Sequence, residues 1–152
     1  AREGFQFRYE TLRLPDSAAE RAASADPLAG FASWWSSEAV LGLLRRITGA
    51  PHIAFADMQA TAYSPGDFLT AHDDDVTGKN RVAAYVLNLT PRWRVEWGGL
   101  LAFHDEAGPE VTALAPAFNR LNLLRVPRRH SVTEVTRAAA YRRYALTGWL
   151  RY

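Results

Sequence analysis

The feature that most restricts the fold is a run of short strand-like segments from residue 53 to the end of the chain. Turn signals such as Ser64-Pro65-Gly66, Thr77-Gly78-Lys79-Asn80 and Gly108-Pro109 separate these segments. The expected strands cover residues 53–63, 67–72, 81–89, 99–104, 110–114, 119–126, 130–135 and 143–151. Many short strands in succession are typical of a β-sandwich or a barrel.

The preceding third of the chain has a different pattern. An opening strand is expected where Phe5, Phe7 and Tyr9 alternate with polar residues. The spacing of Ser17 and Glu20 predicts a capping box for a short helix, which Asp26-Pro27 should interrupt. A second helix is expected from Ser36 or Ser37, with its apolar residues on one face, to Gly49, a favourable C-terminal cap.

Together these patterns predict a mainly β fold with flanking helices (α+β). The expected architecture is a double-stranded β-helix, or cupin-like jelly roll, with the N-terminal helices packed on one side. A chain of 152 residues with 48% hydrophobic residues can form one sizeable core. We therefore expect a single domain over residues 1–152, with helical support at about 16–49 and a β-barrel core at about 53–151.

Three residues in the β region form a candidate metal site. Phe68 to Asp75 is interpreted as the end of a strand, on which His72 and Asp74, two positions apart, share a face. His130 lies near the start of another expected strand, 58 residues after His72. Two imidazoles and one carboxylate, with the remaining coordination positions open, are the ligand set of non-haem iron(II) oxygenases.

The open positions of such a site need a matching co-substrate pocket. Three protein ligands on an octahedral ion leave room for a bidentate 2-oxo acid and dioxygen together. If the acid is 2-oxoglutarate, an Arg fork suits its far carboxylate. Arg143 is the leading candidate, because it shares a strand face with Thr147 and Trp149. The nearby alternatives are weaker, since Arg142 has the opposite parity and Arg137 precedes the strand.

Between about Met58 and Leu150 the chain resembles a known enzyme family. The resemblance is carried by Tyr63-Ser64-Pro65-Gly66-Asp67-Phe68 before the His72/Asp74 pair, Trp97-Gly98-Gly99-Leu100, Asn119-Arg120-Leu121, His130-Ser131-Val132 and Arg143-Tyr144-Ala145-Leu146. The family is that of 2-oxoglutarate- and iron(II)-dependent oxygenases of the prolyl-hydroxylase type. Arg81-Val82-Ala83-Ala84-Tyr85 and Leu89-Thr90-Pro91 are most similar to the branch that includes prolyl hydroxylases acting on a ribosomal protein.

The resemblance implies a role for each matching residue. His72, Asp74 and His130 would bind Fe(II), Arg143 would bind the distal carboxylate of 2-oxoglutarate, and Tyr63 would line that pocket. No catalytic residue is expected beyond the metal centre. The resemblance also implies O2 as co-substrate, ascorbate as reductant and a polypeptide substrate, with a ribosomal protein as one candidate. Relatives often supply a co-substrate hydroxyl near Tyr85; a shift of one residue in register would instead turn Val86 inward.

Other polar residues have simpler interpretations. Asp73 and Asp75 are expected to be solvated strand-end charges. His52 and His104 have no partner at ligand spacing and are expected at the surface or in hydrogen bonds. The pair Gly98-Gly99 indicates either a strand bulge or a close approach of the backbone to a ligand.

Composition and spacing limit the alternatives. The net charge of +2 does not by itself indicate nucleic-acid binding, although six Arg residues cluster between residues 120 and 142. A nucleic-acid demethylase of the same superfamily usually carries a second Arg where this chain has Trp149. A small-molecule hydroxylase and a non-catalytic metal-binding β-barrel module remain as further alternatives. With no cysteine and no long apolar run, neither disulfides nor a membrane span are expected, and a cytoplasmic location is the default.

Overall fold

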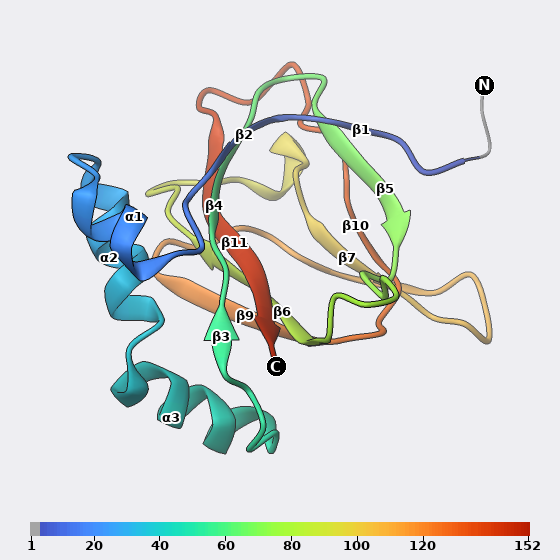
Figure 1. Cartoon of the computed structure of the whole chain (residues 1–152). Coiled ribbons are helices and arrows are strands. Elements are labelled where there is room, and N and C mark those ends of the chain that lie inside the picture. The colour runs from blue at the N-terminus through green and yellow to red at the C-terminus, as the bar shows by residue number, and fades with distance from the viewer. Residues whose placement is uncertain (1–3) are drawn as a thin grey trace.

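The computed structural model describes residues 4–152, and in this range two antiparallel sheets face each other (Figure 1). The five-stranded sheet has the order β1 (Phe7–Arg8), β5 (Phe68–His72), β10 (His130–Val132), β7 (Leu101–His104) and β8 (Val111–Leu114). The six-stranded sheet has the order β2 (Glu10–Arg13), β4 (Gln59–Tyr63), β11 (Arg143–Arg151), β6 (Arg81–Asn88) and β9 (Arg120–Arg125), with β3 (Phe55–Ala56) paired to β11. The mainly β architecture expected from the strand pattern is thus present.

One expected strand is shorter than predicted and another is divided. The opening strand expected at Phe5, Phe7 and Tyr9 forms β1, which pairs with β5, whereas β2 after Tyr9 pairs with β4 and was not expected. The expected strand 53–63 is interrupted at Asp57, between β3 and β4. The backbone carbonyl of Asp57 accepts a hydrogen bond from the Tyr85 hydroxyl at 2.5 Å, and its carboxylate accepts one from the backbone N–H of Trp149 at 2.8 Å. Asp57 therefore connects the segment between β3 and β4 to both β6 and β11.

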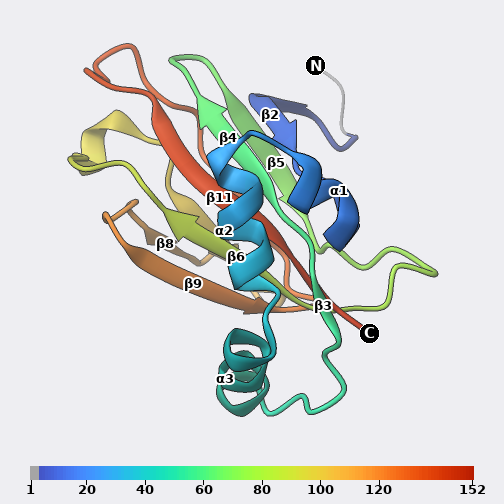
Figure 2. The ribbon, with the colours of Figure 1, turned by 60° about the vertical axis from the view of Figure 1, so that its left-hand side comes forward.

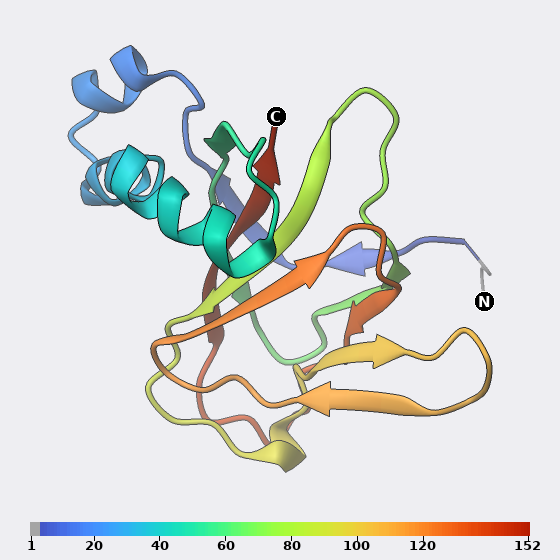
Figure 3. The ribbon, with the colours of Figure 1, turned by 90° about the horizontal axis from the view of Figure 1, so that it is seen from below.

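The helices of residues 4–152 all lie on the outer face of the six-stranded sheet (Figures 2 and 3). They are α1 (Ala18–Ala23), α2 (Pro27–Trp35) and α3 (Glu38–Thr48), and Val95–Trp97 forms a single 3-10 turn. The hairpin of β7 and β8, yellow to orange in Figure 3, lies on the opposite side of the molecule. None of these helices is long and apolar enough to cross a bilayer.

The helix ends confirm the expected caps, with one correction. The Ser17 hydroxyl accepts a hydrogen bond from the backbone N–H of Glu20, and Gly49 ends α3 in the left-handed conformation. Asp26-Pro27 was expected only to interrupt a helix, but it begins α2. The Asp26 carboxylate caps the N–H of Leu28 at 2.8 Å and Pro27 occupies the first turn, where its missing N–H has no cost.

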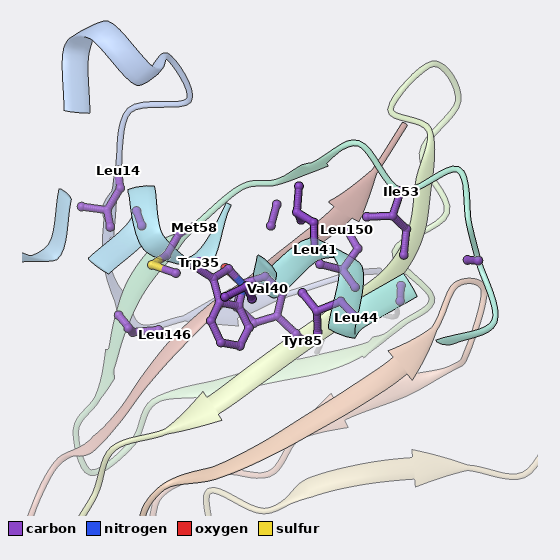
Figure 4. Close-up of a cluster of buried hydrophobic side chains, with 14 residues drawn as sticks. Leu14, Trp35, Val40, Leu41, Leu44, Ile53, Met58, Tyr85, Leu146 and Leu150 are labelled. Atoms are coloured by element: carbon purple, nitrogen blue, oxygen red, sulfur yellow. The ribbon is translucent and has the colours of Figure 1, made fainter. Parts of the chain in front are cut away.

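The main core lies between the helices and the six-stranded sheet (Figure 4). Trp35 of α2 and Leu41 and Leu44 of α3 pack there with residues of the sheet. The sheet side includes Met58, Tyr85, Leu146 and Leu150. Full burial of a side chain such as Leu44 contributes about 2 kcal/mol, so this layer fixes the six-stranded sheet firmly.

Candidate functional site

His72, Asp74 and His130 meet at one edge of the five-stranded sheet. His72 ends β5 and His130 begins β10, and the two residues are direct cross-strand partners. Asp74 Oδ1 lies 3.5 Å from His72 Nε2, and Asp74 Oδ2 lies 3.4 Å from His130 Nε2. One ligand atom from each residue lies within 4.8 Å of the other two. Donors bound at right angles to an ion at about 2.1 Å lie roughly 3 Å apart, so this set fits one metal ion.

The way in which Asp74 reaches the site differs from the expectation. The sequence pattern placed Asp74 on the strand, on the same face as His72. In the structure β5 ends at His72, and Asp74 follows it with φ of 65°. Left-handed backbone is accessible to Asp at small cost, and here it turns the carboxylate back toward the two imidazoles.

Hydrogen bonds select the tautomer of both histidines. The Nδ1 atom of His72 is 3.0 Å from the carbonyl oxygen of Thr70, and that of His130 is 2.7 Å from the carbonyl oxygen of Arg128. A carbonyl can only accept, so Nδ1 carries the proton in each ring. The lone pair of a neutral ring is then on Nε2, which faces Asp74, as a metal ligand requires.

Two of the three groups have pKa shifts that suit a cation. Burial alone raises the pKa of Asp74, but its hydrogen bond with His72 and the charges of both histidines outweigh burial and lower it. Burial lowers the pKa of His130. These two shifts favour the ionised carboxylate and the neutral imidazole that a metal ion needs. Burial also tends to lower the pKa of His72, but the hydrogen bonds with Asp74 and Thr70 and the charges of Asp74 and Asp73 together outweigh it, so the pKa of His72 is raised.

Arg81 supports Asp74 and was not identified from the sequence. Its Nη1 atom donates a hydrogen bond to the Asp74 carbonyl oxygen at 3.0 Å, and its guanidinium carbon lies 3.6 Å from the centre of the Trp149 ring. Trp149 lines the cavity, whereas the sequence left open whether it belongs to the cavity wall or to the core. Only the position of Arg81 after the Gly78-Lys79-Asn80 turn, at the start of a strand, could have indicated this contact.

A cavity of about 410 Å³ connects the triad to Arg143. Arg143 is only 2% exposed. Within residues 4–152 its guanidinium forms no ion pair, and its Nε has no hydrogen-bond partner. Burial lowers the pKa of this guanidinium. A desolvated cation without an anion is unfavourable, and a carboxylate from a bound acid would relieve it. The residues of the cavity thus fit the dicarboxylate co-substrate expected from the sequence.

Two tyrosines are distinguished by the structure. Tyr63 is 3% exposed, lines the cavity, and lies with its ring 5.2 Å from the guanidinium carbon of Arg143. Burial raises the pKa of Tyr63, so the phenol keeps its proton. The Tyr85 ring lies 5.2 Å from that of Trp35 in the core beneath the helices, and the Tyr85 hydroxyl donates a hydrogen bond to the backbone carbonyl of Asp57. Tyr85 and Val86 both border the cavity, but Val86 packs with Ala84, Leu101 and Leu124 of the apolar wall, so this register turns Val86 inward and Tyr85 toward the helices.

The remaining candidates lie apart from the metal site. Asp73 and Asp75 are exposed, as expected. His104 Nε2 hydrogen-bonds with the Ser131 hydroxyl, and His52 packs edge-on against Tyr152. Arg142 forms an ion pair with Glu10 instead of facing the cavity.

Comparison with known proteins agrees with this site. The family model of the 2OG-Fe(II) oxygenase superfamily matches residues 58–151. Prolyl 3-hydroxylase OGFOD1 of Mus musculus is 29% identical over 113 residues, covering 70% of this chain and 20% of that protein. The Xenopus laevis protein of the same name is 30% identical over 113 residues, covering 70% of this chain and 22% of its own length. The chain thus spans about a fifth of the length of the curated relatives it matches.

Solved structures show the same fold. A Pseudomonas putida prolyl-4-hydroxylase superposes with a TM-score of 0.71 at 19% identity, covering 95% of this chain and 72% of that one. A prolyl hydroxylase from Trichoplax adhaerens, in complex with a peptide fragment of a hypoxia inducible factor, superposes with a TM-score of 0.68 at 20% identity, covering 94% and 62%. The predicted double-stranded β-helix and the resemblance to prolyl-hydroxylase-type oxygenases are therefore confirmed.

Proposed function

The chain belongs to the 2OG-Fe(II) oxygenase superfamily, and from this premise we propose that it hydroxylates a prolyl residue in a polypeptide. Iron(II), 2-oxoglutarate and O2 are the cofactor and co-substrates of the family. His72, Asp74 and His130 hold the iron in this proposal, and Arg143 with Tyr63 holds 2-oxoglutarate. Residues 1–152 act as one oxygenase domain, in which the helices at about 16–49 brace the β core.

One observation carries the proposal: the three ligand residues and an unpaired, buried Arg line the same cavity. A metal-binding module without catalysis has no need for a desolvated guanidinium in the cavity of its metal site. A dicarboxylic acid that binds the metal at one end and Arg143 at the other would use both the three ligand residues and the buried guanidinium. The cavity thus favours an oxygenase over a simple binding module.

When bound, iron(II) supplies the oxidation chemistry: one oxygen atom of O2 enters a substrate C–H bond and the other enters succinate, while 2-oxoglutarate loses CO2. The chain orients and shields the reactants. The Nδ1–H bonds of His72 and His130 fix their rings, and Arg81 fixes the turn that carries Asp74.

The residues around the co-substrate hold charge and exclude water. The Arg143 fork offers two parallel N–H donors to a carboxylate, and the protonated Tyr63 hydroxyl lies beside it. Ala84, Leu101 and Leu124 form an apolar part of the cavity wall. An apolar wall limits the water that could quench the reactive centre.

A polypeptide substrate is supported by the names of the relatives and by the cavity mouth. The similar proteins named above are prolyl hydroxylases, and one was solved with a peptide. Phe5 and Phe7, both more than half exposed, line the cavity mouth with Tyr9, and the Phe5 ring lies 5.3 Å from the ring of His72. Exposed aromatic side chains beside a reactive centre favour contact with a partner chain. The resemblance favours a ribosomal protein as substrate and ascorbate as reductant.

The test is incubation with Fe(II), 2-oxoglutarate, ascorbate and proline-containing peptides, including peptides of ribosomal proteins. Succinate release coupled to one added oxygen on a prolyl residue is expected, measured by mass spectrometry. Succinate release that is stimulated by methylated nucleic acid or by free amino acids instead would replace the polypeptide with another substrate. Absence of succinate with every substrate class would contradict the oxygenase assignment itself.

A further inference from the structure

Arg143 lies against a glycine corner formed by Gly98 and Gly99, where both residues have positive φ, 66° and 61°. A Cβ atom built on Gly99 would lie 3.1 Å from Arg143 Cδ. The same atom would lie 3.1 Å from Cγ2 of Val135 and 3.3 Å from Cζ2 of Trp93. The aliphatic part of Arg143 therefore occupies the space that a side chain at position 99 would need.

The glycine corner is held in place by its own contacts. Gly98 forms a bridge with Val135, and the Gly98 carbonyl accepts a hydrogen bond from Trp93 Nε1 at 2.9 Å. Val135 is fully buried, and its N–H donates to the Asp67 carbonyl oxygen at 3.0 Å. A Cβ on Gly98 would lie 2.0 Å from the Glu134 carbonyl oxygen. These contacts restrain the corner, so added bulk at position 99 would press on its neighbours Arg143, Val135 and Trp93.

A second residue also packs near Arg143. The ring of Tyr63 lies 5.2 Å from the guanidinium carbon, and Tyr63 itself is buried. Arg143 Nε has no hydrogen-bond partner within residues 4–152, so packing contributes strongly to its position. Gly99, at the aliphatic part of the side chain, and Tyr63, at the guanidinium, are two of the residues that restrict where the cation lies in the cavity.

We propose that Gly99 is a positioning residue for Arg143, and that its missing side chain gives the pocket its selectivity for 2-oxo acids with a second carboxylate. The inference rests on the proposed function, because it takes Arg143 as the site of that carboxylate. It interprets the glycine pair, which the sequence left open, as a close approach to the side chain that binds the ligand. A bidentate fork tolerates little displacement, so a small shift of Arg143 weakens the distal contact selectively.

The test compares Gly99→Ala with a matched control, Gly49→Ala. Gly49 has a similar φ of 68°, but nothing lies within 4 Å of its added Cβ, and it caps α3 outside the cavity. Both variants carry the backbone strain of a left-handed alanine, and only one adds bulk beside Arg143. Affinities for 2-oxoglutarate and for 2-oxobutanoate, which lacks the second carboxylate, are measured on the Mn(II)-loaded protein by water-proton relaxation.

We expect Gly99→Ala to weaken 2-oxoglutarate by about tenfold and to leave 2-oxobutanoate unchanged. Gly49→Ala should alter neither affinity, while thermal unfolding temperatures fall similarly in the two variants. Equal weakening of both acids by Gly99→Ala would show a merely structural role and overturn the inference, as would an unchanged affinity for 2-oxoglutarate.

A second variant covers failure of Gly99→Ala to fold. Val135→Ala removes both γ-methyl groups of Val135, of which Cγ2 borders the same space, and it should weaken 2-oxoglutarate about threefold with 2-oxobutanoate unchanged. If both acids respond equally to Val135→Ala, the inference is wrong. The proposed function fails in a different way, since the unaltered protein would then not prefer 2-oxoglutarate over 2-oxobutanoate.

Discussion

The six-stranded sheet is covered on its outer face by α1, α2 and α3, whereas no helix of residues 4–152 covers the five-stranded sheet (Figures 2 and 3). The covered sheet carries Arg143, on β11. The uncovered sheet carries His72 and His130, on β5 and β10. The cavity of the candidate site therefore has two walls. We call the six-stranded sheet, which the helices cover, the braced wall, and the five-stranded sheet the open wall.

The difference indicates how each end of the site is stabilised. Burying the guanidinium of Arg143 is costly, and the packed core behind β11 is what can offset that cost. The histidines are oriented instead by short local hydrogen bonds to Thr70 and Arg128, and a bound ion would connect them further. Changes at the open wall should therefore affect catalysis more than stability, and changes behind the braced wall should do the reverse.

The largest expected effect is on the open wall. His72→Ala or Asp74→Ala should lower 2-oxoglutarate turnover by more than about 1000-fold, because two remaining ligands cannot hold the metal in reactive geometry. Succinate release measures this, and circular dichroism should show an unfolding temperature close to that of the unaltered protein. Asp73→Ala, an exposed neighbour, is the control and should retain turnover. Turnover retained by Asp74→Ala would remove the ligand assignment.

The braced wall should respond to Leu44→Ala, which removes a fully buried side chain of α3. The expected loss is about 3 kcal/mol in the free energy of unfolding, from lost burial and the cavity left behind. Leu43 is 46% exposed on the same helix, so Leu43→Ala provides the matched control and should cost far less. Urea denaturation measures both values. Equal losses would contradict the view that α3 braces the sheet through one face.

Arg143→Lys tests the contact between the braced wall and the co-substrate. Lysine keeps the charge but loses the second parallel hydrogen bond, so the Kd for 2-oxoglutarate should rise by roughly tenfold, from a loss of about 1.5 kcal/mol. The affinity for Mn(II), measured in the absence of 2-oxoglutarate, should stay unchanged, because Arg143 lies away from the metal ligands. A change in metal affinity equal to the change in 2-oxoglutarate affinity would contradict the separation of the two walls.

The smallest expected effect is that of mild acidification on metal affinity. Metal binding requires neutral imidazoles, so affinity falls as pH drops through the pKa of each histidine. The pKa of His72 is raised and that of His130 is lowered, so His72 should compete first and His130 only at lower pH. Mn(II) affinity should therefore fall several-fold between pH 7.5 and 6.5. A flat profile over this range would contradict the raised pKa of His72.

Much of the fold follows from local patterns in the sequence. The strand periodicity and turn signals after residue 53 predict the β core, and the caps at Ser17 and Gly49 are present as expected. Local patterns did not predict the strand ends that depend on contacts with distant residues. Asp57 interrupts an expected strand because its carbonyl and carboxylate bond to Tyr85 and Trp149, both distant in sequence.

The candidate site likewise has features that the sequence indicates and features that depend on the tertiary structure. The residue types at positions 72, 74, 130 and 143, with the motifs around them, are enough to indicate the candidate metal ligands and the candidate carboxylate anchor, because the chemistry of each side chain is local. The turn that carries Asp74 back to the imidazoles and the support from Arg81 depend on backbone angles and contacts between strands. No periodicity in the sequence encodes them.

By itself, the sequence indicated the alternation of strands and turns and the candidate side chains for a metal ion and a carboxylate, since these depend on residue type and spacing. Only the tertiary structure decided that Tyr85 packs beneath the helices while Val86 packs with Ala84, Leu101 and Leu124, and that Gly99 lies against Arg143. The physical reason is that strand register and close packing arise from contacts between segments far apart in the chain.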